Sequence, residues 1–115
     1  MRHRLADLIE YLSVPAFVFS LTRRRILASN ALMIRNYGPS FSENFPVVFK
    51  GVKSYSNKPV YLNMSFRNSV PEMHVCNEKD ASFVLMMFSE NTGIVFEMLH
   101  FKKSKENFKD FIFKN

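Results

Sequence analysis

The residues that could do chemistry are few, and only two of them lie close together. His74 and Cys76 are separated by one residue, so on an extended strand their side chains would share a face and could chelate a metal ion. The other histidines, His3 and His100, supply no second close pair, whereas a structural zinc site needs four ligands. A catalytic cysteine–histidine pair would also need a third, orienting group. We therefore expect no metal site and a small buried thiol at Cys76.

Known catalytic signatures are absent from the sequence. There is no G-x-S-x-G, P-loop, G-x-G-x-x-G or H-E-x-x-H pattern, and the three glycines are too dispersed to hold a phosphate group. The acidic residues and histidines show no spacing that assembles a general acid, a general base or a nucleophile. We expect no catalytic residues and no cofactor, and a small enzyme built on a curved sheet is the least favoured hypothesis.

The composition is that of one packed domain. The 115 residues are 47% apolar and include 13 phenylalanines, enough to build a core without disulfides. A single cysteine cannot form an internal disulfide, which favours the cytoplasm. Asp7 and Glu10 interrupt any N-terminal signal sequence, and no apolar run approaches the roughly 20 residues of a membrane span. We therefore expect a soluble cytoplasmic protein with no membrane partner.

Positive charge is the main electrostatic feature, with a formal net charge of +6. Arg23, Arg24 and Arg25 are consecutive in a predicted turn. The C-terminal stretch carries further lysines at Lys102, Lys103, Lys105, Lys109 and Lys114. Such a balance favours nucleic-acid or acidic partners. A solvated turn and helix surface is the commoner explanation, and no zinc-finger, RNP or helix-turn-helix pattern supports a nucleic-acid-binding fold.

An amphipathic helix is predicted over residues 3–12. Apolar side chains recur there with the i, i+3, i+4, i+7 spacing of one helical face, at Leu5, Leu8, Ile9 and Leu12. Pro15 follows shortly and redirects the chain. The apolar face could pack on its own domain or on the same face of a second subunit.

The next stretch predicts a β-hairpin followed directly by a helix. Phe17 and Phe19 share one face of the first strand, and an apolar run resumes at 25–29 after the arginine turn. Asn30 is a good helix N-cap, because its side-chain oxygen can accept an unpaired backbone N–H of the first turn. Gly38, followed by a proline, is a matching C-terminal stop.

This order of elements resembles the opening of a PAS domain, in which two strands, an asparagine and a short helix ending near Tyr/Phe-Gly follow one another. The corresponding segments are 16–21, 25–29, Asn30 and 31–38, and the turn lacks the usual Asp-x-x-Gly. The resemblance implies an α+β fold: a five-stranded antiparallel sheet with short helices on one face, flanked by N- and C-terminal helices. PAS domains of this kind stand at the N-terminus of bacterial cytoplasmic transcription regulators and sensors.

The resemblance also implies how the chain is divided. It suggests an N-terminal dimerisation helix over 1–13, a PAS-like core over 14–101, and a C-terminal helix or linker to an output domain over 102–115. Residues 39–58 would close a ligand cavity. Flavin-binding members carry a reactive cysteine on a mid-domain helix and haem-binding members a histidine there; this chain has neither, which disfavours both cofactors.

Further strands are predicted in the second half. Residues 59–66 alternate as a half-buried strand does, and 73–76 are a weaker candidate, so one of the two could be an edge strand or a loop. The nearly continuous apolar run at 82–89 predicts a central strand, and 94–101 return antiparallel to it after a glycine-containing loop. Glu97 marks its face of that last strand as the outer one.

Three large apolar residues would share that outer face and would need a cover, which the N-terminal helix of the same or a second subunit could provide. The dimer-interface candidates are therefore Leu5, Leu8, Ile9, Leu12, Val95, Leu99 and Phe101.

An apolar organic ligand is the remaining small-molecule option. Flexible methionines and aromatic rings would make an adaptable cavity, although the same residues would equally form a closed core. The candidate lining residues are Phe17, Phe19, Met33, Phe45, Met64, Met86, Phe96 and Met98.

The preferred interpretation is a non-catalytic regulatory or sensory module that homodimerises and has room for a small apolar ligand. As part of a bacterial transcription regulator, it would meet DNA only through a downstream domain. Its switch would be a change in the packing of the terminal helices. The alternative is a basic nucleic-acid-binding module that uses Arg23, Arg24, Arg25 and the lysine-rich tail, and whose affinity would fall steeply with salt.

Overall fold

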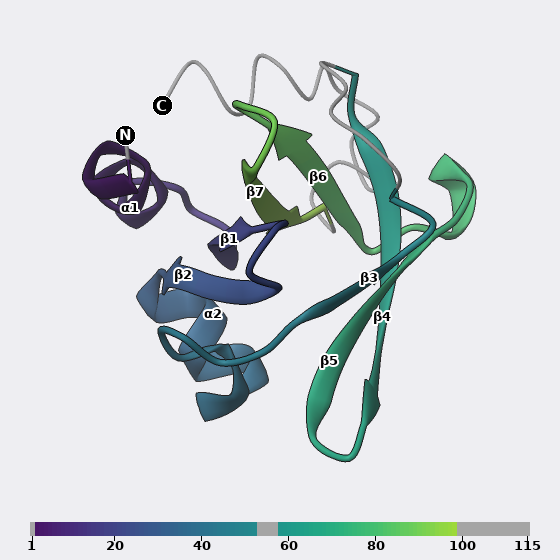
Figure 1. Cartoon of the computed structure of the whole chain (residues 1–115), viewed down its shortest axis with the longest axis horizontal. Coiled ribbons are helices and arrows are strands. Elements are labelled where there is room, and N and C mark those ends of the chain that lie inside the picture. Colours follow the sequence, from purple (N-terminus) through teal and green to yellow (C-terminus); the bar gives the residue numbers. More distant parts are fainter. Residues whose placement is uncertain (1, 53–57, 99–115) are drawn as a thin grey trace.

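The computed structural model describes residues 2–52 and 58–98, and in this part of the chain seven strands form one curled sheet with a helix packed on each face (Figure 1). The helical elements are α1 (Arg2–Glu10), α2 (Ala31–Tyr37) and the short 3-10 turns η1 (Pro39–Phe41) and η2 (Glu78–Asp80). The strands are β1 (Ala16–Ser20), β2 (Arg25–Ser29), β3 (Val48–Lys50), β4 (Val60–Arg67), β5 (Val70–Val75), β6 (Phe83–Met87) and β7 (Thr92–Glu97).

The sheet is mixed, and its two ends are joined. Its order is β2-β1-β7-β6-β4-β5-β3, and all neighbours are antiparallel except β3 and β5. The segment before β3 pairs with β2 at the opposite end: the Ile26 N–H donates to the Phe45 carbonyl at 2.9 Å, and the Asn44 N–H donates to the Ile26 carbonyl at 2.7 Å. The segment 44–50, which leaves the turn at Asn44 and runs into β3, therefore links both ends and gives the sheet its half-barrel curl.

Aromatic rings and methionines fill the inner face of this curl, called here the inner core. Phe17 and Phe19 of β1 are fully buried, and the Phe19 ring lies 4.4 Å, centroid to centroid, from the ring of Phe49. The centroids of Phe17 and Phe41 are 5.4 Å apart. Phe41 of η1 and Met33 of α2 are also fully buried, so α2 and η1 cover this core.

A second apolar cluster, the outer core, lies on the opposite face of the sheet beneath α1. Leu5 and Ile9 of α1 are buried against Val18 of β1 and against Ile94 and Phe96 of β7. The predicted helix is confirmed over residues 2–10, and of its expected apolar face Leu5 and Ile9 are buried whereas Leu8 is 44% exposed. Helix α1 therefore covers the sheet of its own chain.

The predicted N-cap at Asn30 is confirmed, and its side chain has a wider role. Asn30 is 2% exposed. Its Oδ1 accepts the backbone N–H groups of Met33 at 2.9 Å and of Ala16 at 3.1 Å. Its Nδ2 donates to the carbonyls of Ile9 and Val14, both at 2.9 Å. One buried amide thus ties the end of α1, the start of β1 and the start of α2 together.

The predicted α+β fold, a PAS-like five-stranded antiparallel sheet with short helices on one face and flanking terminal helices, is wrong. The described residues are mostly sheet, with seven strands in mixed orientation and a short helix on each face. Segment 39–58 contains β3. Both 59–66 and 73–76 contribute to strands, which a two-residue turn connects at Asn68 and Ser69, with φ of 51° and 67°. These positive φ values belong to the type I′ turn that suits a tight hairpin.

Replacing Asn30 should cost more stability than a helix cap alone. Asn30→Ala removes the donor to the Val14 carbonyl and the acceptor of the Ala16 and Met33 N–H groups, while the Ile9 carbonyl keeps the Leu12 N–H, so we expect the free energy of unfolding to fall by about 3 kcal/mol or more. Asn30→Asp keeps the acceptor but loses both donors and should also destabilise. Urea denaturation followed by circular dichroism measures both, with Asn36→Ala on the exposed side of α2 as control. A loss below about 1 kcal/mol for Asn30→Ala would contradict the role given to this amide.

Candidate functional site

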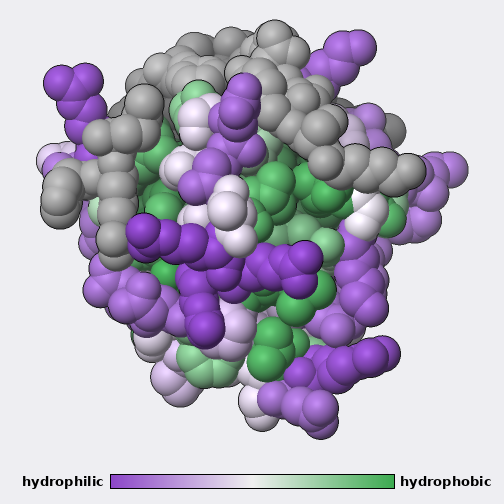
Figure 2. Space-filling model, in the orientation of Figure 1, coloured by the Kyte–Doolittle hydropathy of each residue, from purple (hydrophilic) through white to green (hydrophobic). Residues whose placement is uncertain are grey.

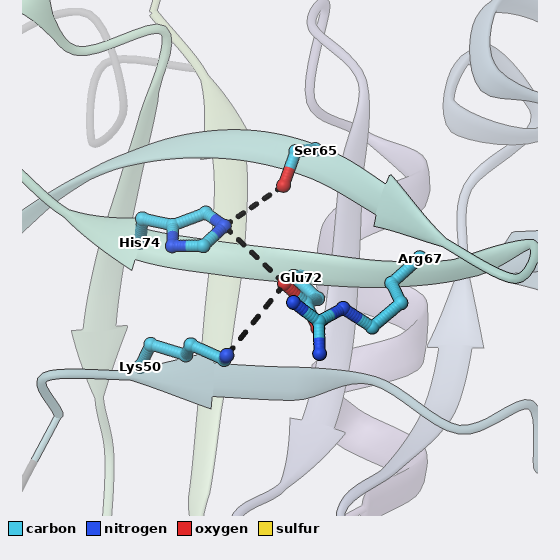
Figure 3. A network of polar contacts seen from close by, with 5 residues as sticks. All are labelled: Lys50, Ser65, Arg67, Glu72 and His74. Carbon is cyan, nitrogen blue, oxygen red and sulfur yellow. Dashed lines mark hydrogen bonds and ion pairs between the residues drawn. The ribbon is translucent and has the colours of Figure 1, made fainter.

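A polar network centred on Glu72 lies on the outer face of β3, β4 and β5 (Figure 3). Strand alternation puts Glu72 and His74 on one face of β5, and the register places Ser65 opposite Glu72 and Lys50 opposite His74. The Glu72 carboxylate lies 3.9 Å from Lys50 Nζ, 3.6 Å from Arg67 Nε and 3.6 Å from His74 Nε2. Three side chains, one from each of three strands, therefore meet at the Glu72 carboxylate.

Ser65, His74 and Glu72 have the residue types of a catalytic triad but not its geometry. Ser65 Oγ is 2.8 Å from His74 Nε2, and Glu72 Oε1 approaches the same nitrogen at 3.6 Å. In a triad the histidine contacts the nucleophile through one ring nitrogen and the acid through the other. Because both contacts here use Nε2, Glu72 cannot orient the ring for proton transfer from Ser65. The network favours binding or strand pairing over acyl transfer.

The network presents positive charge to solvent. The Glu72 side chain is 9% exposed, whereas those of Lys50 and Arg67 are 49% and 71% exposed, so the carboxylate lies beneath its cations. Arg67 contacts Glu72 through Nε. Within residues 2–52 and 58–98, no acceptor contacts its two terminal nitrogens. Burial, and then the Glu78 carboxylate, raise the pKa of Tyr61 on the same face, so this phenol adds no negative charge at neutral pH.

The arginine turn between β1 and β2 is ordered by backbone contacts. Thr22 N–H donates to Asn91 Oδ1, and Arg24 has a φ of 56°, in the left-handed region that reverses the chain. Arg25 donates from Nη1 to the Asn44 carbonyl at 3.2 Å. Arg23 and Arg24 are exposed, and among the described residues neither guanidinium has an acceptor.

Segment 44–47 connects this turn to the Glu72 network. The Val47 N–H donates to the Arg24 carbonyl at 3.0 Å, and β3 begins at the next residue. Lys50 is three residues further along, at roughly 3.3 Å per residue. Val47 is fully buried, so alternation turns Val48 and Lys50 outward.

We call the resulting surface the basic wall, which comprises Arg23, Arg24, Arg25, Lys50 and Arg67. Arg25, Lys50 and Arg67 lie on the outer face of β2, β3 and β4, and Arg23 and Arg24 are exposed in the turn before β2. On the face drawn in Figure 2, strongly hydrophilic side chains cross the middle between exposed hydrophobic groups. The sequence predicted the three arginines as nucleic-acid candidates, whereas Lys50 and Arg67 join them only through the sheet register.

The predicted ligand-lining residues are divided between the two faces of the sheet. Those that form or pack against the inner core are Phe17, Phe19, Met33, Phe45 and Met64. Those that form or pack against the outer core are Met86, Phe96 and Met98. Since the sheet itself separates the two groups, all eight residues cannot line one cavity. A smaller apolar cavity stays a prediction.

Two open surface pockets lie away from these eight residues. One of about 350 Å³ lies between β2, α2 and η1, with Ile34 and Phe41 among its lining residues. The other, of about 210 Å³, is lined by Ser20, Arg23, Leu27 and Asn91 beside the arginine turn. Both are shallow, so neither encloses a small molecule.

The predicted dimer-interface residues also separate in the structure. Leu5 and Ile9 are buried in the outer core of their own chain, with Leu12 packed against it. Val95 is fully buried in the inner core, on the face opposite the one expected. Of the predicted interface residues in α1, Leu8 is 44% exposed and can contact a partner.

A residue that sequence reasoning missed adds to this exposed surface. Tyr11 lies just beyond the end of α1 and is 77% exposed, and because its N–H donates to the Leu8 carbonyl at 3.1 Å it continues the helical turn on the side of Leu8. The spacing of three residues between Leu8 and Tyr11 could have predicted that they are neighbours, but Tyr11 was not included in the predicted apolar face. Leu99, Phe101 and the expected C-terminal helix over 102–115 lie outside the described residues.

A polar pair inside the inner face was also missed. Glu97, taken as the marker of an outer face, is 8% exposed, and its carboxylate accepts a hydrogen bond from the Tyr37 hydroxyl of α2. The Tyr37 ring packs at 5.5 Å, centroid to centroid, from Phe83. The structure therefore reverses the expected faces of β7: Ile94 and Phe96 turn toward α1, whereas Glu97 faces α2.

Within the described residues, no group of three or more histidine, cysteine, aspartate and glutamate side chains could hold a metal ion. None of the described helices is both long and apolar enough to cross a membrane. Comparison with protein-family models, with curated proteins and with solved structures gives no match for this chain. The resemblance to PAS domains stays a prediction from residues 16–38.

Neutralising Glu72 should destabilise the protein through repulsion among its cations. For Glu72→Gln we expect the free energy of unfolding to fall by about 1 kcal/mol at low salt. The loss should shrink in high salt, because salt screens the repulsion between Lys50, Arg67 and their neighbours. Urea denaturation at two salt concentrations measures this, with the exposed Glu90→Gln as the matched control. A loss that does not depend on salt would mean that packing, not charge, gives Glu72 its role.

Proposed function

We propose that this chain is a non-catalytic binding module that contacts the phosphate backbone of a nucleic acid with the basic wall. The observation that carries the proposal is the hydrogen bonding of segment 44–47 to β2. It brings the turn that carries Arg23 and Arg24 next to Val47, three residues before Lys50, although Lys50 is more than twenty residues later in the chain. Such spatial clustering of exposed cations is the electrostatic signature of phosphate binding.

The chemistry of the wall suits phosphate. Arginine offers a planar fork of donors that matches phosphate oxygens, and lysine adds a point charge. Arg23 and Arg24 have no internal acceptor among the described residues, so their donors are available without breaking an ion pair. The net charge of +6 adds long-range attraction for a polyanion. The lysine-rich tail, outside the described residues, would extend the same charge.

Two observations favour this function over the others considered. The contacts of Ser65 and Glu72 to one nitrogen of His74 do not support acyl transfer. The division of the eight apolar candidates between two cores weakens the case for a ligand sensor. Binding by the basic wall requires neither a catalytic triad nor an apolar cavity, since its side chains already face solvent.

Removing the two unpaired arginines should weaken nucleic-acid binding and its salt dependence together. For Arg23→Ala/Arg24→Ala on duplex DNA, we expect the slope of log K against log salt to become shallower by about 1.8, or 0.9 for each lost phosphate contact. Fluorescence anisotropy of a labelled duplex across a salt series measures it.

The matched control is Arg35→Ala/Lys79→Ala, which removes the same charge from exposed positions on α2 and η2. Equal weakening by both double variants would assign the binding to net charge and not to the wall. If the unmodified chain bound no nucleic acid even at low salt, the proposed function would be excluded.

A second function, homodimerisation as part of a regulatory module, is favoured by the outer side of α1. Leu8 and Tyr11 are large hydrophobic side chains exposed side by side there, while Leu5 and Ile9 anchor the helix to its own sheet. A firmly anchored helix with an exposed apolar side is a suitable surface for pairing with a second copy. Rearrangement of such a pair would be the regulatory step.

Polar substitution on that side should prevent self-association. We expect the unmodified chain to dimerise at micromolar concentration and Leu8→Ser/Tyr11→Ser to be monomeric there, because the paired apolar surface is lost. Sedimentation equilibrium measures both. Phe88→Ser, at an exposed phenylalanine on another surface, is the control and should still dimerise. A double variant that dimerises as well as this control would count against α1 as the interface.

A further inference from the structure

The tip of the β4–β5 hairpin carries an exposed aromatic ring next to an arginine. The hairpin extends away from the rest of the sheet in Figure 1. Phe66 is 49% exposed and Arg67, the last residue of β4, has a side chain 71% exposed. The turn at Asn68 and Ser69 follows directly. Neither Phe66 nor Arg67 is a member of the inner or the outer core.

The Phe66 ring is held on one side only. It meets the ring of Phe41 at a centroid distance of 6.2 Å and an interplanar angle of 83°, an edge-on contact with a fully buried partner. This contact restricts the rotamers of Phe66 while about half of the side chain stays in water. A ring already ordered in this way loses little conformational entropy when a flat ligand stacks on it.

Arg67 is oriented in a comparable way. Its Nε lies 3.6 Å from Glu72 Oε2 and its side chain is 71% exposed, so the guanidinium is held beside the carboxylate while much of it stays in solvent (Figure 3). A guanidinium fixed through Nε can still donate two parallel hydrogen bonds from its outer edge to a phosphate. Glu72 thus acts as a positioning residue for this arginine.

The edge of β4 at this tip is open. Strand β6 pairs with β4 from Val60 to Leu62 and not beyond, within the described residues. Phe66 and Arg67 are consecutive, so their side chains leave opposite faces of β4 beside this open edge. A single nucleotide that passes over the edge could place its base on one face and its phosphate on the other.

We propose that the hairpin tip binds one nucleotide of a single-stranded nucleic acid, with its base stacked on Phe66 and its phosphate on Arg67. This inference rests on the proposed function and names single strands as the preferred partner. In a duplex both faces of each base are already stacked, so Phe66 has no free base to meet. Aromatic stacking with a positively charged surface is the usual basis of binding to single strands without sequence preference.

The test compares two substitutions of the same residue. Phe66→Leu keeps an apolar side chain but removes the aromatic face, whereas Phe66→Tyr keeps the face. Anisotropy titrations use a short labelled oligothymidylate and a duplex of the same length. We expect Phe66→Leu to weaken binding of the single strand about tenfold or more, Phe66→Tyr to bind as the unmodified chain does, and duplex affinity to stay unchanged in both. Circular dichroism confirms that each variant is folded.

The possible failures are distinguishable. If the unmodified chain binds neither probe, the proposed function fails and this inference with it. If it binds both probes but Phe66→Leu and Phe66→Tyr are equivalent, the basic wall stands and the stacking role of Phe66 is overturned. Equal loss of single-strand and duplex binding in Phe66→Leu would also overturn it, because stacking acts on the single strand alone.

Discussion

The pairing of segment 44–47 with β2 is the constraint on which the rest of this structure depends. A seven-stranded sheet has two edges with unpaired backbone groups, which favour association with other strands. Here the hydrogen bonds of Asn44 and Phe45 with Ile26 give β2 its second partner, and the same segment continues as β3 beside β5. This connection fixes the curl, and the curl decides which side chains face inward. Both the aromatic inner core and the basic wall follow from it.

The interior of the curled sheet is closely packed, and the lack of space for a side chain at Gly93 illustrates this. Gly93 of β7 pairs with Phe19 of β1. A Cβ at Gly93 would lie 2.9 Å from Phe19 Cζ and 2.8 Å from the Met86 carbonyl oxygen, which is too close for any other residue. The abundance of phenylalanine therefore has a structural explanation: large rings fill the curve, and glycine is placed where a ring meets the backbone.

Local signals could be read from the sequence, and non-local ones could not. The Asn30 cap, the Gly38 stop and the helix α1 depend on neighbouring residues, and each is present as predicted. Strand β3 is three residues long with a parallel partner far along the chain, so no local pattern marks it. Strand β5 contains Pro71, which normally argues against a strand. It is tolerated because Pro71 pairs with Phe66, the second pair from the two-residue turn, and alternate pairs of an antiparallel ladder do not exchange hydrogen bonds.

The same limit applies to the charged residues, and it explains why the site was only partly predicted. The alternation of residues along a strand shows which residues share a face but not which face is buried. Glu97 was assigned to the outer face because its hydrogen-bond donor, Tyr37, belongs to a helix distant in the sequence. The role of Glu72 likewise could not be predicted from the sequence, because only the sheet register brings cations from β3 and β4 to its carboxylate. A nearly buried carboxylate beneath exposed cations lowers the net charge of the wall but fixes the positions of those cations. For a surface that must present donors to phosphate, such fixed geometry compensates for the charge that is lost.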